Sequence, residues 1–363
     1  MVPQSALYET IHSQPEVARG VLAGAASEAE RAAGLLAQAR RVYLAGTGTS
    51  SHAAVVGEHL LRLAGADAFA TTNFDFVNYP RPRDARDVLV AISHRGTKRY
   101  GTLAIAAARE AGMTVIGVTG LEAPMEGTDV LLRTAPSERS STHSASYTGN
   151  LTALALLALR LGERNGGGSG SDVAALRDAL ERLPRDMEAV LAREEDVRPV
   201  AEALAASGRL VLMGAGPNAV TAREGALKVK ESSYLVAEGF ELETALHGGL
   251  QSLQPGDVAV VIAAQGPALE RTGDLVRALD LLGARLLIVA DERAVASLPT
   301  PRDPARGPTV IAYPAVPEAL SPALAVIPLQ LLAAYTAMLR GTNADSFRHE
   351  DPIFAAIAAS YTL

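Results

Sequence analysis

The chain has 363 residues, of which 48% are hydrophobic and 20% charged, so it is neither disordered nor a polyelectrolyte and is long enough for two domains. Its 33 basic and 40 acidic residues give a net charge of −7, the wrong sign for a protein that binds nucleic acid along the phosphate backbone. The absence of cysteine excludes disulfides, thiolate metal ligands and the thiol nucleophile of a Cys-dependent glutamine amidotransferase within this chain.

The N-terminal region, residues 1–30, is predicted to be a helical segment. It contains Glu9 and Glu16 and lacks the basic start and apolar core of a signal peptide. The most apolar window, residues 323–339, is shorter than the about 20 residues of a membrane span and is interrupted by Pro328 and Gln330. We therefore expect a cytoplasmic protein without a membrane partner.

Three segments recur in the same order at a spacing of about 170 residues, which indicates a duplicated domain. Each is an apolar run typical of a buried strand, and Ala/Leu-rich helical patterns such as 101–111 and 269–282 lie between them. Strands that are apolar on both faces and alternate with helices predict a parallel sheet covered on both sides. The matched pairs are 41–48 with 209–216, 87–96 with 257–266, and 112–118 with 283–289.

The predicted fold class is α/β, with two tandem three-layer α/β/α sandwiches of flavodoxin-like design. We expect the first domain at residues 31–165 and the second at 208–341. Between them, residues 166–207 are expected to form a linker and a helix, because Gly and Ser dominate 165–171 and a charged helical pattern follows from Asp172 to Ser207. Residues 342–363 are expected to be a C-terminal tail.

The loops that follow the predicted strands of the first copy are rich in hydroxyls. Ligands of open parallel sheets bind beyond the carboxyl ends of the strands, and hydroxyls, Gly-freed amides and helix N-termini are donors for an oxyanion. The alternative is that these Ser and Thr residues only cap helices. The loops comprise Gly48, Thr49 and Ser50; Ser93, His94, Arg95, Gly96 and Thr97; and residues 140–148, including Ser144 and Thr148.

The second copy has lost nearly all of these hydroxyls in its matching loops, 215–218 and 263–267. Gly214-x-Gly216-x-x-Ala219 formally fits a dinucleotide-binding pattern, whose next strand should end in an acidic residue. The segment after Val236 offers Glu238 but continues into a Glu-rich stretch rather than a clear strand. We therefore favour a sugar phosphate bound by the first copy over a nicotinamide cofactor.

Candidate catalytic residues lie in the second copy. Residues 223–234 predict a helix that carries Glu231, and residues 238–249 are expected to be an irregular segment, without counterpart in the first copy, that carries His247. A Glu and a His can form an acid–base pair. By spacing alone, Glu231 could equally be a solvated residue that pairs with Lys228 or Lys230, and His247 an ordinary loop residue.

These motifs together strongly resemble the tandem SIS (sugar isomerase) family, from about residue 10 to the C-terminus. The resemblance rests on Gly48-Thr49-Ser50, on Ser93-x-x-Gly96-Thr97, on Ser146-Tyr147-Thr148, on the helix Glu224-Gly225-Ala226-Leu227-Lys228-x-Lys230-Glu231, and on His247-Gly248. The isomerase half of glucosamine-6-phosphate synthase is the best-known relative. Because the chain has no Cys, we expect the isomerase design without the glutaminase half.

The resemblance implies roles for these residues. Ser50, Ser93, Thr97 and the segment 141–148 would surround a phosphorylated sugar, Glu231 would move a proton between C1 and C2, and His247 would assist ring opening. In this family the His is typically donated by the neighbouring subunit, so a homodimer is expected. The resemblance requires no metal ion and no organic cofactor.

Two departures from the family pattern bear on the reaction. The usual Ser-Gln-Ser-Gly is Ser93-His94-Arg95-Gly96 here, and Arg95 could bind a phosphate or a sulfonate bidentately or point away from the ligand. No Lys follows Lys230, although the synthase has one near its end. The expected reaction is therefore aldose–ketose isomerisation or amino-sugar-phosphate isomerisation with deamination. A deglycase, an isomerase of a sulfonated sugar and a non-catalytic sugar-phosphate sensor are the alternatives.

Overall fold

The computed structural model describes residues 2–166, 170–303 and 307–361, and divides into two compact units. The first unit comprises Ser13–Glu138, His143–Pro184 and Ala355–Leu363. The second comprises Met1–His12, Arg139–Thr142 and Arg185–Phe354. The centre of the predicted linker, residues 167–169, lies outside the described residues.

The first unit contains a parallel five-stranded sheet with the order β2-β1-β3-β4-β5. Every residue of the central strand β3 is buried, which explains its continuous apolar sequence. This strand order is that of flavodoxin-like sheets, as predicted. The strands are β1 (Arg41–Gly46), β2 (Ala68–Thr72), β3 (Asp87–Ser93), β4 (Thr114–Thr119) and β5 (Val130–Arg133).

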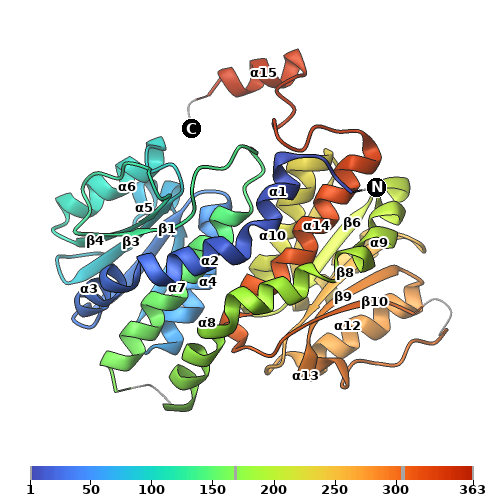
Figure 1. The fold of residues 1–363 in the computed structure, drawn as a ribbon, viewed down its shortest axis with the longest axis horizontal. Coiled ribbons are helices and arrows are strands. Elements are labelled where there is room, and N and C mark those ends of the chain that lie inside the picture. The colour runs from blue at the N-terminus through green and yellow to red at the C-terminus, as the bar shows by residue number, and fades with distance from the viewer. Residues whose placement is uncertain (1, 167–169, 304–306, 362–363) are drawn as a thin grey trace. The chain divides into compact units, whose positions relative to one another are not determined.

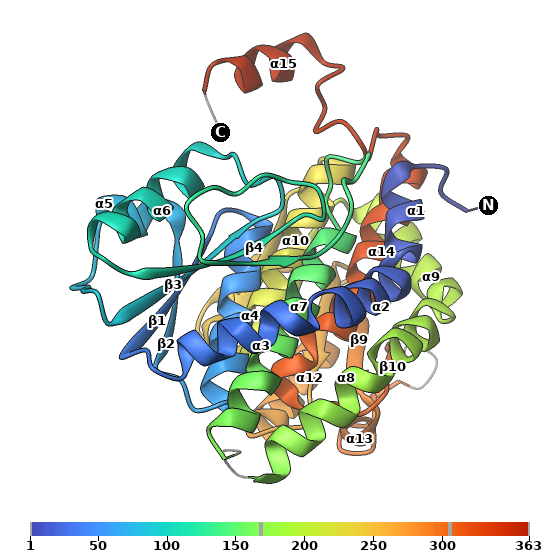
Figure 2. The same ribbon diagram turned by 60° about the vertical axis from the view of Figure 1, so that its left-hand side comes forward.

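Helices cover both faces of this sheet (Figures 1 and 2). On the α6 side, an apolar core joins Tyr43, Leu89, Ile105 and Met113. On the other face α7 is buried along nearly its whole length, since other helices pack around it. The helices of one face are α2 (Gln14–Gly24), α3 (Ala26–Leu36), α4 (Thr49–Leu63) and α7 (Ala145–Arg164), and those of the other are α5 (Asn73–Asn78) and α6 (Arg99–Glu110).

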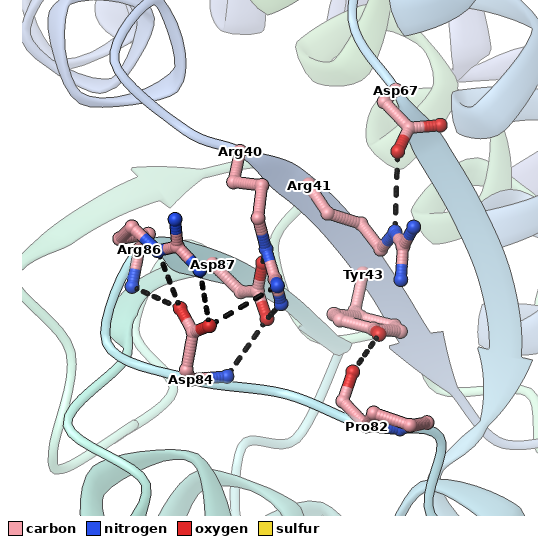
Figure 3. A network of polar contacts seen from close by, with 8 residues as sticks. All are labelled: Arg40, Arg41, Tyr43, Asp67, Pro82, Asp84, Arg86 and Asp87. Carbon is pink, nitrogen blue, oxygen red and sulfur yellow. Dashed lines mark hydrogen bonds and ion pairs between the residues drawn. The ribbon is translucent and has the colours of Figure 1, made fainter.

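The amino ends of β1 and β3 are joined by charged side chains (Figure 3). The carboxylate of Asp87 is fully buried and accepts hydrogen bonds from Arg40 Nε at 2.9 Å and from an Arg40 terminal nitrogen at 2.6 Å. The backbone N–H of Asp84 donates to the same carboxylate at 2.9 Å. This bidentate pair fixes the amino edge of the sheet and leaves the opposite, carboxyl edge for ligands.

The second unit repeats the design with a parallel sheet of order β10-β9-β8-β6-β7, which is the order of the first sheet read from its other edge. The strands are β6 (Leu210–Gly214), β7 (Ala237–Glu241), β8 (Val258–Ala263), β9 (Arg285–Asp291) and β10 (Thr309–Tyr313). Its helical elements are α1 (Ala6–His12), α9 (Glu194–Ser207), α10 (Pro217–Ser233), α11 (Leu242–Leu246), η1 (Gly249–Ser252), α12 (Leu269–Leu282), α13 (Glu292–Val295), η3 (Glu318–Leu320) and α14 (Pro322–Arg340).

Two sheets of one topology, each covered by helices, confirm the predicted α/β fold. Two further helices contain residues assigned to both units. They are α8 (Gly170–Leu191), where the boundary along the chain follows Pro184, and α15 (Pro352–Ala359). Helices α8 and α9 correspond to the helical stretch predicted between Asp172 and Ser207.

One prediction about the second copy is wrong. The segment 238–249 is not an insertion, because β7 pairs with β6 as β2 pairs with β1, and α11 follows β7 as α5 follows β2. The sequence pattern does not reveal this strand, because β7 lies at the edge of the sheet. Backbone pairing at an edge tolerates polar residues such as Glu238 and Glu241. The first copy therefore has a counterpart for this segment.

The turns after β1 and β6 have the same geometry. Gly48 and Gly216 both have positive φ, 58° and 53°, and precede α4 and α10. A Cβ on Gly46 would lie 2.3 Å from the backbone of Ser50, and one on Gly214 would lie 2.3 Å from that of Asn218. A tight strand-to-helix turn therefore requires both Gly-x-Gly pairs.

Helix α14 accounts for the most apolar part of the sequence. Among the described residues, the stretch Glu318–Arg340 is the one helical segment long and apolar enough to cross a membrane, yet 89% of its apolar window is buried inside the protein. It packs against α10 and α9, so it is a core helix.

Candidate functional site

The carboxyl edge of the first sheet presents helix N-termini and hydroxyls. Gly48 precedes the first turn of α4, in which Thr49 and Ser50 are half-buried. Thr47 is exposed, and its hydroxyl accepts a hydrogen bond from Asn73 Nδ2 at 3.2 Å. The N-terminal turn of α4 thus lies beside hydroxyl groups, an arrangement that suits an oxyanion.

The loop between β3 and α6 begins with a closed turn at Ser93. The Ser93 side chain is 7% exposed, and its Oγ accepts a hydrogen bond from Gly96 N at 3.2 Å. Thr119 Oγ1 donates to the Ser93 carbonyl at 2.7 Å. Arg95 and Thr97 are exposed on this loop, so their side chains are available to a ligand.

Gly96 is required by this loop, which gives a direct test. Its φ is 71°, and a Cβ there would lie 1.7 Å from the carbonyl oxygen of Pro124. We expect Gly96→Ala to destabilise the protein by more than about 2 kcal/mol, because the loop must move as well as adopt a strained φ. The matched control is Gly166→Ala, since Gly166 has φ 78° but nothing within 4 Å of the Cβ position.

Denaturant unfolding and titration with inorganic phosphate would measure the two effects of Gly96→Ala. The control should lose only about 1–2 kcal/mol and keep the anion affinity of the wild type. Equal stability and equal anion affinity of the two variants would show that the β3–α6 loop is not held as described.

The segment before α7 contains a carboxylate that caps the helix. Glu138 accepts hydrogen bonds from Ser144 N at 2.9 Å and from Ser146 N at 2.7 Å, one on each carboxylate oxygen. The Ser144 hydroxyl is buried and has no hydrogen-bond partner among the described residues. Thr148 is also buried, but its hydroxyl donates to the Ala145 carbonyl at 3.3 Å, within the helix.

Positive charge and imidazole groups gather on the β3–α6 loop. Burial lowers the pKa of His94, and Arg95 lowers it further, while Glu138 opposes both. Burial also lowers the pKa of Lys98, again with a contribution from Arg95. Arg95 thus disfavours the charged form of both neighbours, and an anion bound at this loop would relieve that repulsion.

In the second unit, Glu231 belongs to a buried charged triad on α10. Lys228 Nζ lies 2.6 Å from Glu231 Oε2 and 3.3 Å from Glu224 Oε1. The side chains of Lys228 and Glu224 are 1% and 0% exposed, whereas that of Glu231 is 18% exposed. The spacing i, i+4, i+7 places all three on one face of the helix.

The triad bears on one interpretation of Glu231, that of a solvated residue paired with a neighbouring Lys. It pairs with the buried Lys228, while Lys230 is exposed, so Glu231 is not a solvated surface residue. Burial alone would lower the pKa of Lys228, but Glu224 and Glu231 raise it above its ordinary value. The ammonium is therefore charged, and it fixes the Glu231 carboxylate at the point where the triad reaches solvent.

His247 occupies a different environment. It follows α11, its side chain is 78% exposed, and its Nε2 lies 3.3 Å from Glu243 Oε2. Glu243 also binds Arg271 Nε at 2.6 Å. The structure places the His247 ring on the surface of its unit beside a charged pair.

In the second unit, the Glu318 carboxylate lies beside the turns that correspond to the hydroxyl-rich loops of the first unit. The carboxylate of Glu318 lies 3.5 Å from the Cβ position of Gly216, and its Oε2 lies 2.5 Å from that of Gly266. Burial raises the pKa of Glu318. A carboxylate of the chain itself thus lies beside the start of α10, in agreement with the loss of hydroxyls from these loops.

The regions that contain both sheets, both Gly-x-Gly turns and the charged helix α10 match the model of one protein family. The family model described as SIS domain matches residues 35–160 and 203–340. The chain belongs to the SIS family. Both copies of the SIS domain coincide with a parallel sheet and its helices.

Related proteins agree with this assignment. The chain is 31% identical over 354 residues to glutamine–fructose-6-phosphate aminotransferase [isomerizing] of Gloeobacter violaceus, a match that covers 94% of this chain and 57% of the relative. This SIS protein therefore spans little more than half the length of that relative.

Solved SIS structures share the fold. The C-terminal domain of glucosamine-fructose-6-phosphate aminotransferase from Francisella tularensis has a TM-score of 0.85 at 20% identity, covering 94% of this chain and 98% of that one. Tagatose-6-phosphate ketose/aldose isomerase from Escherichia coli has a TM-score of 0.73 at 19% identity, covering 95% of this chain and 97% of that one.

Sequence analysis assigned no site role to three polar residues of this SIS protein, one in the first unit and two in the second. Lys228 and Glu224 could have been found from their helical spacing to Glu231, although their burial could not. Glu138 gave no signal, because a cap that reaches six and eight residues forward, to the N–H groups of Ser144 and Ser146, fits no local capping pattern.

Proposed function

We propose that this protein moves a proton between C1 and C2 of a phosphorylated sugar, and so interconverts aldose and ketose forms or converts an amino sugar to an imine, which water hydrolyses to a ketose and ammonia. The observation that carries the proposal is the buried triad, in which Lys228 holds a partly exposed Glu231 carboxylate. A fixed carboxylate is suited to removing a proton beside a carbonyl. The Gloeobacter relative carries the name of an isomerizing aminotransferase, which supports the same chemistry.

The proposed reaction needs a base that acts on both carbons. Glu231 would take the proton from one carbon to give an enediol or enolamine and return it to the other. Lys228 would keep the Glu231 oxygens in place, since its charge is retained at neutral pH. The hydrogen moves as a proton, so this route requires no redox cofactor.

The first unit would hold the phosphate. The positive N-terminal ends of α4 and α6, the hydroxyls of Ser50, Ser93 and Thr97, and the exposed guanidinium of Arg95 are groups of the right kind. Ser144 adds a buried hydroxyl at the start of α7. The triad and these loops lie in different units, and each is tested separately.

Incubation with a panel of 6-phosphosugars in D₂O, followed by NMR, tests the reaction through solvent exchange at C2. We expect exchange with at least one phosphorylated aldose, ketose or amino sugar, and a raised melting temperature with the same compound. Binding without exchange would favour a sensor. Release of a free amino acid from a fructosamine phosphate would favour a deglycase, and turnover confined to a 6-sulfo sugar would indicate that Arg95 reads a sulfonate.

We further propose a cytoplasmic homodimer in which His247 acts on the neighbouring subunit, an assignment supported by the SIS family resemblance and the exposed ring. Mixing equal amounts of Glu231→Gln and His247→Asn subunits tests it. If His247 acts in the partner, heterodimers contain one complete site, and about a quarter of wild-type turnover returns. If both residues act within one subunit, the mixture stays inactive. Cell fractionation tests the compartment.

A further inference from the structure

We propose that His94, Glu138 and His143 of the first unit form a binding site for a divalent transition-metal ion of the zinc type. One ligand atom from each residue lies within 4.8 Å of the other two. The rings of His94 and His143 have centroids 5.2 Å apart and stand nearly perpendicular, at 89°. The three residues come from two loops, one after β3 and one before α7, that meet at the carboxyl edge of the sheet.

The surroundings of Glu138 and His143 are those of metal ligands. Metal-binding carboxylates and imidazoles are held by outer hydrogen bonds that orient them. Glu138 accepts one backbone N–H on each oxygen, from Ser144 and Ser146, and each oxygen keeps a second lone pair. His143 Nδ1 pairs with Ser146 Oγ at 3.3 Å, which fixes the orientation of the ring.

His94 supplies an independent reason to expect a ligand. Its Nδ1 is buried and has no hydrogen-bond partner among the described residues, and such groups are rare in folded proteins. The ring lies against Gly120, where an added Cβ would be 3.0 Å from the Nδ1 and Cε1 atoms. The absence of a side chain at Gly120 therefore leaves space for the imidazole ring. Among the described residues, nothing forms a hydrogen bond with its buried Nδ1.

The donor set selects the kind of ion. Two imidazoles and one carboxylate suit Zn²⁺ and neighbouring transition metals, whereas Mg²⁺ and Ca²⁺ prefer oxygen ligands. Zn²⁺ takes its ligands at about 2.0–2.2 Å, so small side-chain rotations would close the present cluster around it. Three protein ligands leave one tetrahedral position open. Since Arg95 and Lys98 place positive charge nearby, we expect an anion or an anionic ligand group in that position.

Titration of the full-length protein with Co²⁺, followed by visible absorption, tests the site. We expect one equivalent per chain with the intense bands of tetrahedral Co²⁺, displaced by Zn²⁺. His94→Gln and His143→Ser should each weaken binding by about 100-fold or more. The control is His349→Gln, since His349 is exposed and lies elsewhere in the chain. Thermal unfolding of each variant without metal separates lost ligation from lost structure.

The proposal is overturned if wild type and the two His variants bind Co²⁺ alike, or if His349→Gln removes the binding. These measurements use no sugar, so they are independent of the proposed isomerase reaction. C2 exchange measured with EDTA and after Zn²⁺ addition then shows whether the ion takes part in turnover.

Discussion

Glu231→Gln is expected to reduce C2 proton exchange and turnover by about 10²–10⁴-fold, the range typical of a lost general base. The amide retains the shape of the carboxylate but cannot accept the proton at neutral pH. Lys228 keeps Glu224 as a partner in this variant, so the triad loses one charge and not its cation. Ligand affinity, measured by thermal shift, should fall much less than the exchange rate.

The matched control for Glu231→Gln is Glu238→Gln, because Glu238 is an exposed Glu of the same unit, on β7. It should exchange and turn over like the wild type. Full exchange by a folded Glu231→Gln protein with a true substrate would eliminate Glu231 as the base, and equal losses in both variants would point to a general electrostatic effect.

Lys228→Met is expected to lower the free energy of unfolding by about 3–5 kcal/mol, the cost of removing one partner from a buried ion pair. The carboxylates of Glu224 and Glu231 would be left without the ammonium that lies 3.3 and 2.6 Å from them. Methionine nearly preserves the length of the side chain. The decrease in the free energy of unfolding should therefore come mainly from the lost charge and less from changed packing.

Denaturant unfolding across pH separates charge from packing in Lys228→Met. Without the cation, burial raises the pKa of Glu224 in the folded state, so the folded protein binds more protons than the unfolded chain. The free energy of unfolding of the variant should therefore fall as the pH rises above the ordinary pKa of a carboxyl group. The control is Arg31→Met, which removes an exposed pair with Glu28 and should cost about 0–1 kcal/mol. Similar losses in both variants, without pH dependence, would contradict the described burial.

The central strands could be predicted because burial on both faces leaves a continuous apolar run. β3 and β8 show this pattern, and both were identified together with their relation by duplication. The edge strand β7 could not be identified in this way, since its residues are only partly buried and several are charged. Edge strands depend on backbone pairing with a neighbour, which leaves little trace in the sequence.

The same limit applies to the candidate site. Glu231 could be selected from its helix, and Lys228 from its helical spacing to Glu231, but the burial of this pair depends on the packing of α10 against α14. Hydroxyls in the first copy could be recognised as anion donors. Only the fold shows that the Thr148 hydroxyl already donates a hydrogen bond to the Ala145 carbonyl of its own helix. Contacts between residues that are distant in the chain decide these roles.

The position of Glu318 has a consequence for how related sequences can vary. Any side chain at Gly266 would collide with this carboxylate, and Gly216 combines a positive φ with the same neighbour. Positions 216, 266 and 318 should therefore change together during evolution, with larger residues at 266 appearing where the acid has been shortened or lost. In the first copy nothing lies within 4 Å of the Cβ position of Gly48, whereas Gly96, the counterpart of Gly266, is constrained by the carbonyl oxygen of Pro124 instead.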